Sequence, residues 1–305
     1  LTLIPQRFWW WWQASRVIQD IDLLGNISPL SPIDEFPAFS FVLGDLHPHV
    51  LVMPFAMLVI GLALNAFRGG MDGDWRFFGV TLPYQPSQFF VSALILGGIA
   101  FLNTWDLPVY FSLLLGAFML HRVQQKGWDW ERLSELLKLA FPLGSVSLLL
   151  YAPFFISFQS QAGGILPNLI YPTRGLYLWV MFGALWIPIF LFFGQLFRFR
   201  KPANWKWGTG LVLLLMAGLL SLAVALGVIV SQTQIGQQVL ASQGETYFLS
   251  ALGKSLVHRL RFGAGLATLL LVLVPGLAFL IGMTRKKDKE DEKHGPLPFL
   301  LLMVV

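Results

Sequence analysis

The chain has 305 residues, of which 56% are hydrophobic and 12% charged, against about 25% charged residues in an ordinary soluble domain. This composition excludes a typical soluble enzyme and indicates an integral membrane protein. The absence of cysteine excludes disulfides, thiolate metal sites and cysteine nucleophiles. The net charge is +5, but the basic residues lie in short loops between apolar runs and form no single face. We therefore expect no nucleic-acid partner.

Residues 1–46 are predicted to form an outer interfacial segment that ends in an acidic loop. Five consecutive aromatic residues, Phe8 to Trp12, are typical of the aromatic belt at lipid headgroup depth. A short amphipathic helix and a loop rich in Ser and Pro then lead to Asp34. The chain begins without Met and ends inside the apolar run 299–305. We expect it to be a fragment of a longer membrane protein, with helices missing at both ends.

Residues 47–305 are predicted to form an all-α polytopic transmembrane helical bundle. Seven apolar segments each approach the ~20 residues that cross ~30 Å of hydrocarbon, and an eighth begins at residue 297. The seven segments are approximately 47–67, 87–103, 107–121, 136–157, 176–197, 208–231 and 262–284. Pro108 would break one long helix through the second and third segments. These are therefore expected to be two short helices that meet at a polar turn, 104–106.

The basic residues predict the orientation of these helices. If Asp34 faces outward, fifteen of the 21 Lys and Arg residues fall in loops on the inner side, and the positive-inside rule makes that side cytoplasmic. Six basic residues then remain outside: Arg7, Arg16, Arg174, Lys254, Arg259 and Arg261. The amphipathic stretch Leu249 to Leu260 carries several of them beside His258, and could lie on the membrane surface.

A polar stretch at residues 34–49 holds the main candidates for chemistry. It contains three carboxylates and two imidazoles, Asp34, Glu35, Asp45, His47 and His49. Polar groups at the edge of the hydrocarbon are costly and are usually kept for function. One carboxylate of the pair Asp34 and Glu35 can act as a catalytic base while the other orients it. The alternative is a solvated pair that caps the next helix.

The Asp45, His47 and His49 side chains form a ligand set that recurs in divalent metal sites, here for Mg²⁺ or Mn²⁺. Residues two apart diverge by ~200° in a regular helix, so both imidazoles can face one ion only if the backbone is still extended at His47. Pro48 fits the first turn of a helix, which places Asp45 where an N-cap would be. The alternative is an N-cap with two interfacial histidines.

Further candidates lie on the same predicted side of the membrane. Asp106, in the polar run 103–108, either caps the helix that follows or belongs to a site. Arg174 can hold a phosphate in a bidentate manner, or can extend to lipid headgroups. Together with Trp105 and Arg16, these two residues are the candidate substrate-binding residues. We expect Asp34 or Glu35, Asp45, His47 and Asp106 to converge within about 10 Å in one outward-facing cavity.

Three stretches resemble a known family. Trp11-Trp12 with Ser15-Arg16, residues 34–49 (DEFPAFSFVLGDLHPH) and residues 103–108 (NTWDLP) closely resemble the "YYY" membrane proteins of Chloroflexi and archaea. That uncharacterised family is grouped with the GT-C-type polytopic glycosyltransferases. The resemblance covers roughly residues 8–110 and rests mainly on topology beyond them.

The resemblance implies an enzyme of the prokaryotic plasma membrane that uses a polyprenyl-phosphate-linked sugar donor on the outer face. Asp34 and Glu35 stand where such enzymes carry an Asp/Glu pair, which would deprotonate the acceptor. The His-Pro-His segment is not a general feature of those glycosyltransferases, so the metal question stays open. Two alternatives remain: a transporter, whose polar residues would lie near the membrane midplane in broken helices, and a non-catalytic structural subunit in contact with lipid.

Overall fold

A computed structural model describes residues 18–27, 37–44, 46–77, 79–158, 169, 174–284 and 295–305. The described residues are mostly helical, with one two-stranded sheet among them, so the all-α prediction is confirmed. Asp34, Glu35, Asp45 and Arg16 lie outside the described residues.

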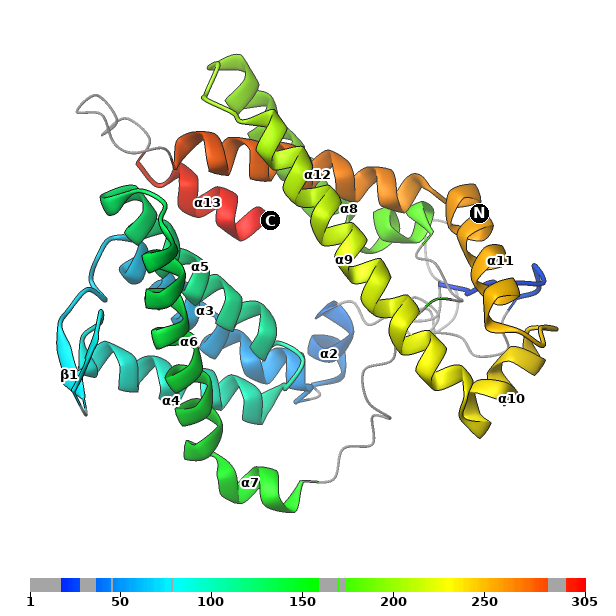
Figure 1. The fold of residues 1–305 in the computed structure, drawn as a ribbon, viewed down its shortest axis with the longest axis horizontal. Coiled ribbons are helices and arrows are strands. Elements are labelled where there is room, and N and C mark those ends of the chain that lie inside the picture. The colour runs from blue at the N-terminus through cyan, green and yellow to red at the C-terminus, as the bar shows by residue number, and fades with distance from the viewer. Residues whose placement is uncertain are drawn as a thin grey trace. The chain divides into compact units, whose positions relative to one another are not determined.

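The chain divides into two compact units (Figure 1). Unit 1 consists of Leu1–Asp45, Ala162–Arg200 and Trp205–Pro275, and unit 2 of Leu46–Gln161, Lys201–Asn204 and Gly276–Val305. Each unit is described by itself.

Unit 2 is built on four helices that pack around an apolar core. The elements in chain order are α3 (Pro48–Phe67), the antiparallel hairpin of β1 (Trp75–Phe77) and β2 (Val80–Leu82), α4 (Pro86–Leu102), α5 (Leu107–Lys126), α6 (Trp130–Leu150), α7 (Ala152–Ser157) and α13 (Leu297–Val304). Helix α3 packs against α4 and α5, and α4 packs against α6 (Figure 1). Side chains such as Ala93, Leu96, Leu114 and Leu139 are fully buried between them.

Unit 1 contains the two longest described helices, α8 and α9, together with shorter ones. They are α2 (Pro37–Leu43), α8 (Gly175–Arg198), α9 (Trp205–Ser231), α10 (Gln234–Ser242), α11 (Phe248–Arg261) and the first part of α12 (Ala264–Met283). Helix α8 is tied to α12 by a hydrogen bond from Trp179 Nε1 to Thr268 Oγ1 of 3.1 Å. The amphipathic stretch 249–260 lies within helix α11.

Five of the described helices are long and apolar enough to cross a membrane: α3, α6, α8, α9 and α12. Helix α4 is shorter, with 17 residues. The predicted break is confirmed, since α4 ends at Leu102 and α5 begins at Leu107. The predicted segment 136–157 was wrong at both ends. Helix α6 begins at Trp130 because Asp129 caps it by accepting from the Trp130 amide, and it ends at Leu150, ahead of α7.

Close packing of α4 on α6 depends on Gly97. A Cβ atom at this position would lie 2.4 Å from the Ser147 carbonyl oxygen and 2.5 Å from the Tyr151 ring. Small residues at such crossings let helix backbones approach closely in membranes. The neighbouring carbonyl belongs to a helix backbone and cannot move aside as a flexible side chain could.

We expect Gly97→Ala to lower the free energy of unfolding by about 1–3 kcal/mol, because overpacking forces the two helices apart. The measurement is equilibrium unfolding in detergent micelles. Gly210→Ala in α9 is the matched control, since a Cβ there meets nothing within 4 Å and alanine favours a helix by up to about 1 kcal/mol over glycine. Equal stability of the two variants would contradict the packing argument.

Candidate functional site

One end of unit 2 gathers polar side chains from two of the predicted stretches. We call it the histidine end, and it consists of His47, His49, Asn103 and Asp106. Asn103 Nδ2 lies 3.1 Å from His49 Nδ1 and 3.0 Å from Asp106 Oδ2. Asn103 is buried, so its amide bridges the start of α3 to the break between α4 and α5.

The Asn103 amide also determines where the proton of neutral His49 lies. An amide nitrogen has two hydrogens and accepts no hydrogen bond, so Nδ2 donates to both Asp106 and His49. The Nδ1 atom of His49 must then be the acceptor, which leaves the proton of a neutral ring on Nε2. His49 therefore presents an N–H donor away from Asn103.

His47 is the N-cap of α3, and its backbone is extended, with φ −62° and ψ 142°. Its carbonyl accepts from the amides of Val50 and Leu51, at 2.9 and 3.0 Å. The condition for two histidines to lie on one side is thus met, and the His47 and His49 ring centroids are 5.5 Å apart. The prediction that Asp45 is the N-cap was wrong, because Pro48 at the first helical position makes His47 the cap.

The proposed metal site is only partly assembled from the described residues. Among them, no group of three His, Cys, Asp or Glu side chains could hold an ion. His47 and His49 supply two imidazoles, of which His49 Nδ1 is engaged by Asn103. A Mg²⁺ or Mn²⁺ site there depends on Asp45, which lies outside the described residues, and stays a prediction.

Asp106 stands at the N-cap position of α5, yet its side chain makes no capping hydrogen bond. It accepts from Asn103 instead, so simple helix capping does not account for this carboxylate. Trp105 next to it is 60% exposed and free of the apolar core. Of the group predicted to converge, Asp106 is joined through Asn103 to His49, and the His47 ring lies beside the His49 ring. The place of Asp34, Glu35 and Asp45 in the group stays a prediction.

Arg174 belongs to unit 1, where it directly precedes α8. Its guanidinium carbon lies 4.9 Å from the centre of the Tyr177 ring and 5.0 Å from the centre of the Phe262 ring. Nη1 also donates to the Tyr177 hydroxyl at 3.2 Å. The side chain is thus held between aromatic rings.

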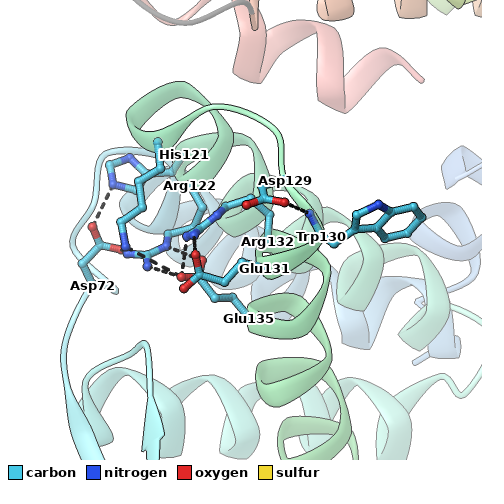
Figure 2. A network of polar contacts seen from close by, with 9 residues as sticks. Asp72, His121, Arg122, Asp129, Trp130, Glu131, Arg132 and Glu135 are labelled. Atoms are coloured by element: carbon cyan, nitrogen blue, oxygen red, sulfur yellow. Dashed lines mark hydrogen bonds and ion pairs between the residues drawn. The ribbon is translucent and has the colours of Figure 1, made fainter.

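The opposite end of unit 2 carries an ion-pair network that the sequence analysis missed (Figure 2). We call it the glutamate end, and it consists of Asp72, His121, Arg122, Glu131, Arg132 and Glu135. Arg122 donates from Nε and Nη2 to the two Glu135 oxygens, at 2.8 and 2.6 Å. Arg132 bonds the same carboxylate and also Glu131. Arg122, Arg132 and Glu135 are buried.

His121 extends this network to the loop after α3. Nδ1 lies 2.9 Å from the Phe67 carbonyl oxygen, and Nε2 lies 2.9 Å from Asp72 Oδ2. Both partners are acceptors, an arrangement that a doubly protonated imidazolium satisfies fully. The network therefore links the loop after α3 to the end of α5 and the start of α6. Its charges are mutually paired, which is typical of a structural clamp.

Comparison with known proteins shows the family to which the chain belongs. The profile of a family described as "Uncharacterized membrane protein (DUF2298)" matches residues 2–297. The chain belongs to this family of uncharacterised membrane proteins. No curated protein and no solved structure matches it. The resemblance is thus confirmed at the level of an uncharacterised membrane family.

This family member also has an apolar groove of about 1010 Å³ in unit 2. It lies between the β1–β2 hairpin, the start of α4 and one side of α6, and is lined by residues that include Trp75, Phe89, Trp130 and Phe141. Tyr84 closes it by donating from its hydroxyl to the Lys138 carbonyl at 3.3 Å, and burial raises the pKa of Tyr84 to about 12. The groove offers apolar surface and no cluster of reactive groups.

Replacing Glu135 by Gln should destabilise unit 2 strongly. The change removes the carboxylate that Arg122 and Arg132 share, and breaking a buried ion pair in this way costs about 3–5 kcal/mol. Equilibrium unfolding in detergent measures the loss. Glu131→Gln is the control in the same helix: the Glu131 side chain is 67% exposed, so the loss should stay within about 1 kcal/mol. Similar losses of stability in both variants would contradict the central role of Glu135 in this ion-pair network.

Proposed function

We propose that this membrane protein is a GT-C-type glycosyltransferase, related to the "YYY" proteins, which transfers sugar from a polyprenyl-phosphate donor on the outer face of a prokaryotic plasma membrane. One observation carries the proposal. The two stretches with the most distinctive resemblance, 34–49 and 103–108, supply the histidine end, where Asn103 bonds both His49 and Asp106.

The reaction assigns a role to each part of this end. The bond between sugar C1 and the phosphate oxygen breaks, a bond between C1 and the acceptor oxygen forms, and polyprenyl phosphate leaves. Asp34 or Glu35 takes the proton of the acceptor hydroxyl. The His49 Nε2–H donates to the phosphate, and Asp106, fixed by Asn103, accepts from sugar hydroxyls beside the exposed Trp105. Arg16 is proposed to contact the donor as well.

A bound Mg²⁺ or Mn²⁺ would neutralise charge on the leaving phosphate. Asp45, His47 and His49 are the proposed ligands. His49 would bind the ion through Nε2 only in the tautomer with its proton on Nδ1, so metal ligation by His49 is an alternative to its hydrogen bond with Asn103 and to donation from Nε2–H to the phosphate.

The same geometry weighs against the two alternatives. A transporter site is expected in broken helices near the membrane midplane, whereas the histidine end lies where α4 ends and where α3 and α5 begin. A purely structural subunit would use Asp106 as a helix cap, and the Asp106 side chain makes no capping hydrogen bond.

The proposal requires the histidine end to face outward. We expect Thr104→Cys, next to Asp106, to react with a membrane-impermeant maleimide on intact cells. Lys126→Cys, at the far end of α5, should react only after permeabilisation. Both labels are unambiguous because the chain has no other cysteine. The reverse labelling pattern would place the histidine end on the inner side and contradict a reaction on the outer face.

Transfer activity tests the chemistry directly. Purified protein in liposomes should move labelled sugar from a polyprenyl-phosphate donor to an acceptor. Asp34→Asn or Glu35→Gln should lower kcat about 10²–10⁴-fold with little change in donor binding, because the amide cannot take a proton. Asp106→Asn should raise KM instead, since the contact it loses is made to bound substrate.

The control is Glu131→Gln at the glutamate end, which should leave transfer unchanged. If Asp106 were only a helix cap, Asp106→Asn would be silent, because asparagine caps about as well as aspartate. Absence of transfer with every lipid-linked sugar tried, in a folded protein, would favour the transporter or the structural subunit.

A further inference from the structure

Three cationic or titratable side chains surround one aromatic ring in unit 1. The Arg174 guanidinium carbon lies 5.0 Å from the centre of the Phe262 ring, and that of Arg261 lies 5.8 Å from it. The His258 ring packs edge-on against the same ring, with centroids 4.9 Å apart. Residues at the start of α8 and the end of α11 thus meet at Phe262.

This Phe262 cluster, defined as Arg174, His258, Arg261 and Phe262, carries excess positive charge. Neither arginine forms an ion pair with a carboxylate among the residues the structure describes. Burial is the main cause that lowers the pKa of His258. The charges of Arg261, Arg174 and Arg259 lower this pKa further, whereas Asp22 raises it. The Arg174 and Arg261 guanidiniums thus bring two positive charges to the Phe262 ring.

His258 adds an unused polar atom to the cluster. Its Nδ1 is buried and has no hydrogen-bond partner among the described residues. A buried nitrogen without a partner is costly, and arginines held near one another without a counter-charge repel. An anion would satisfy all of these groups at once.

Helix α11 indicates that this anion belongs to a lipid. Ala251 and Ser255 are buried against the rest of unit 1, and Ser255 Oγ donates to the Leu169 carbonyl. A stripe of apolar side chains is exposed on the helix and comprises Leu249, Leu256, Val257 and Leu260. A helix with such a stripe and basic residues beside it lies in the membrane interface, with headgroups at its polar side.

We propose that the Phe262 cluster binds the phosphate headgroup of a membrane lipid whose chains lie along the exposed stripe of α11. The two guanidiniums donate to phosphate oxygens in the paired geometry that arginine favours, and His258 donates from Nδ1 in the tautomer that carries its proton there. The choice of polyprenyl phosphate as the lipid rests on the proposed function.

Equilibrium binding to the full chain in lipid nanodiscs tests this inference. The probe is a labelled polyprenyl phosphate without any acceptor, so binding is read without turnover. Arg174→Gln with Arg261→Gln should weaken binding about tenfold or more, because charge-assisted hydrogen bonds to phosphate are lost. Arg198→Gln, an exposed arginine in the last turn of α8, is the matched control and should bind as the wild type does.

The lysine pair Arg174→Lys with Arg261→Lys separates binding from folding. It keeps both charges and forfeits the planar donor pair, so affinity should fall several-fold at unchanged stability. Unchanged binding by the lysine pair and the glutamine pair overturns the inference, as does an equal loss with Arg198→Gln. Tight binding of the uncharged polyprenol would overturn the phosphate role, and full competition by inorganic phosphate would overturn the lipid assignment.

These outcomes are distinguishable from those of the proposed function. Selective lipid-phosphate binding without sugar transfer would support the Phe262 cluster as a lipid site and contradict the proposed glycosyltransferase. Sugar transfer with lipid binding unaffected by the glutamine pair would support the glycosyltransferase and contradict the lipid site.

Discussion

The shared carboxylate of Glu135 is the interaction on which the arrangement of unit 2 depends. It neutralises Arg122 from α5 and Arg132 from its own helix, and all three side chains are buried. An unpaired buried charge is far more costly than a buried pair, so α5 and α6 are held in one register at this end. Helix α5 begins at Leu107, and fixing its far end therefore also positions the break at 103–106. The histidine end is positioned by a clamp at the other end of the same helix.

The two ends of unit 2 differ in how completely their polar groups are used. At the glutamate end, each carboxylate faces a cation and both nitrogens of His121 face acceptors. At the histidine end, one buried amide serves two partners, and the His49 Nε2–H and the second oxygen of Asp106 point elsewhere than Asn103. Arg132 Nε and one Asp72 oxygen make no hydrogen bond among the described residues, but the charges at the glutamate end are paired, which stabilises the fold, while donors and acceptors directed elsewhere allow binding. This difference is the physical reason for assigning the proposed chemistry to the histidine end.

Local sequence rules were enough to predict much of this fold. Pro108 and the polar residues before it predicted the break between α4 and α5, and Pro48 predicted the start of α3, although its cap is His47 and not Asp45. The amphipathic pattern of residues 249–260, with basic residues on its polar side, coincides with helix α11. Each of these features depends on residues close together in the chain, where backbone geometry and helix periodicity apply directly.

The ion-pair network could not be predicted in the same way. Arg122 and Arg132 were interpreted as loop residues because charged side chains normally end a membrane segment, but they lie inside α5 and α6. Their burial is possible only because Glu135 and Asp72 arrive from other turns and another loop. The matching acidic residues on the same predicted side, Asp72, Glu131 and Glu135, were the available signal. The Phe262 cluster likewise requires a contact between α8 and α11 that no local pattern contains.

Both polar surfaces proposed to function share one chemical logic, each within its own unit. In unit 2, the Asn103 amide holds His49 as an N–H donor and Asp106 as an acceptor, a combination suited to a neutral, hydroxyl-rich group beside an anion. In unit 1, Arg174 and Arg261 offer donors alone around Phe262, which suits an anion without hydroxyls. A sugar linked through phosphate to a long apolar chain contains a hydroxyl-rich part, an anionic part and a part that belongs in the membrane. The histidine end supplies chemistry for the hydroxyl-rich part of the proposed donor, and the Phe262 cluster by itself supplies chemistry for a lipid phosphate.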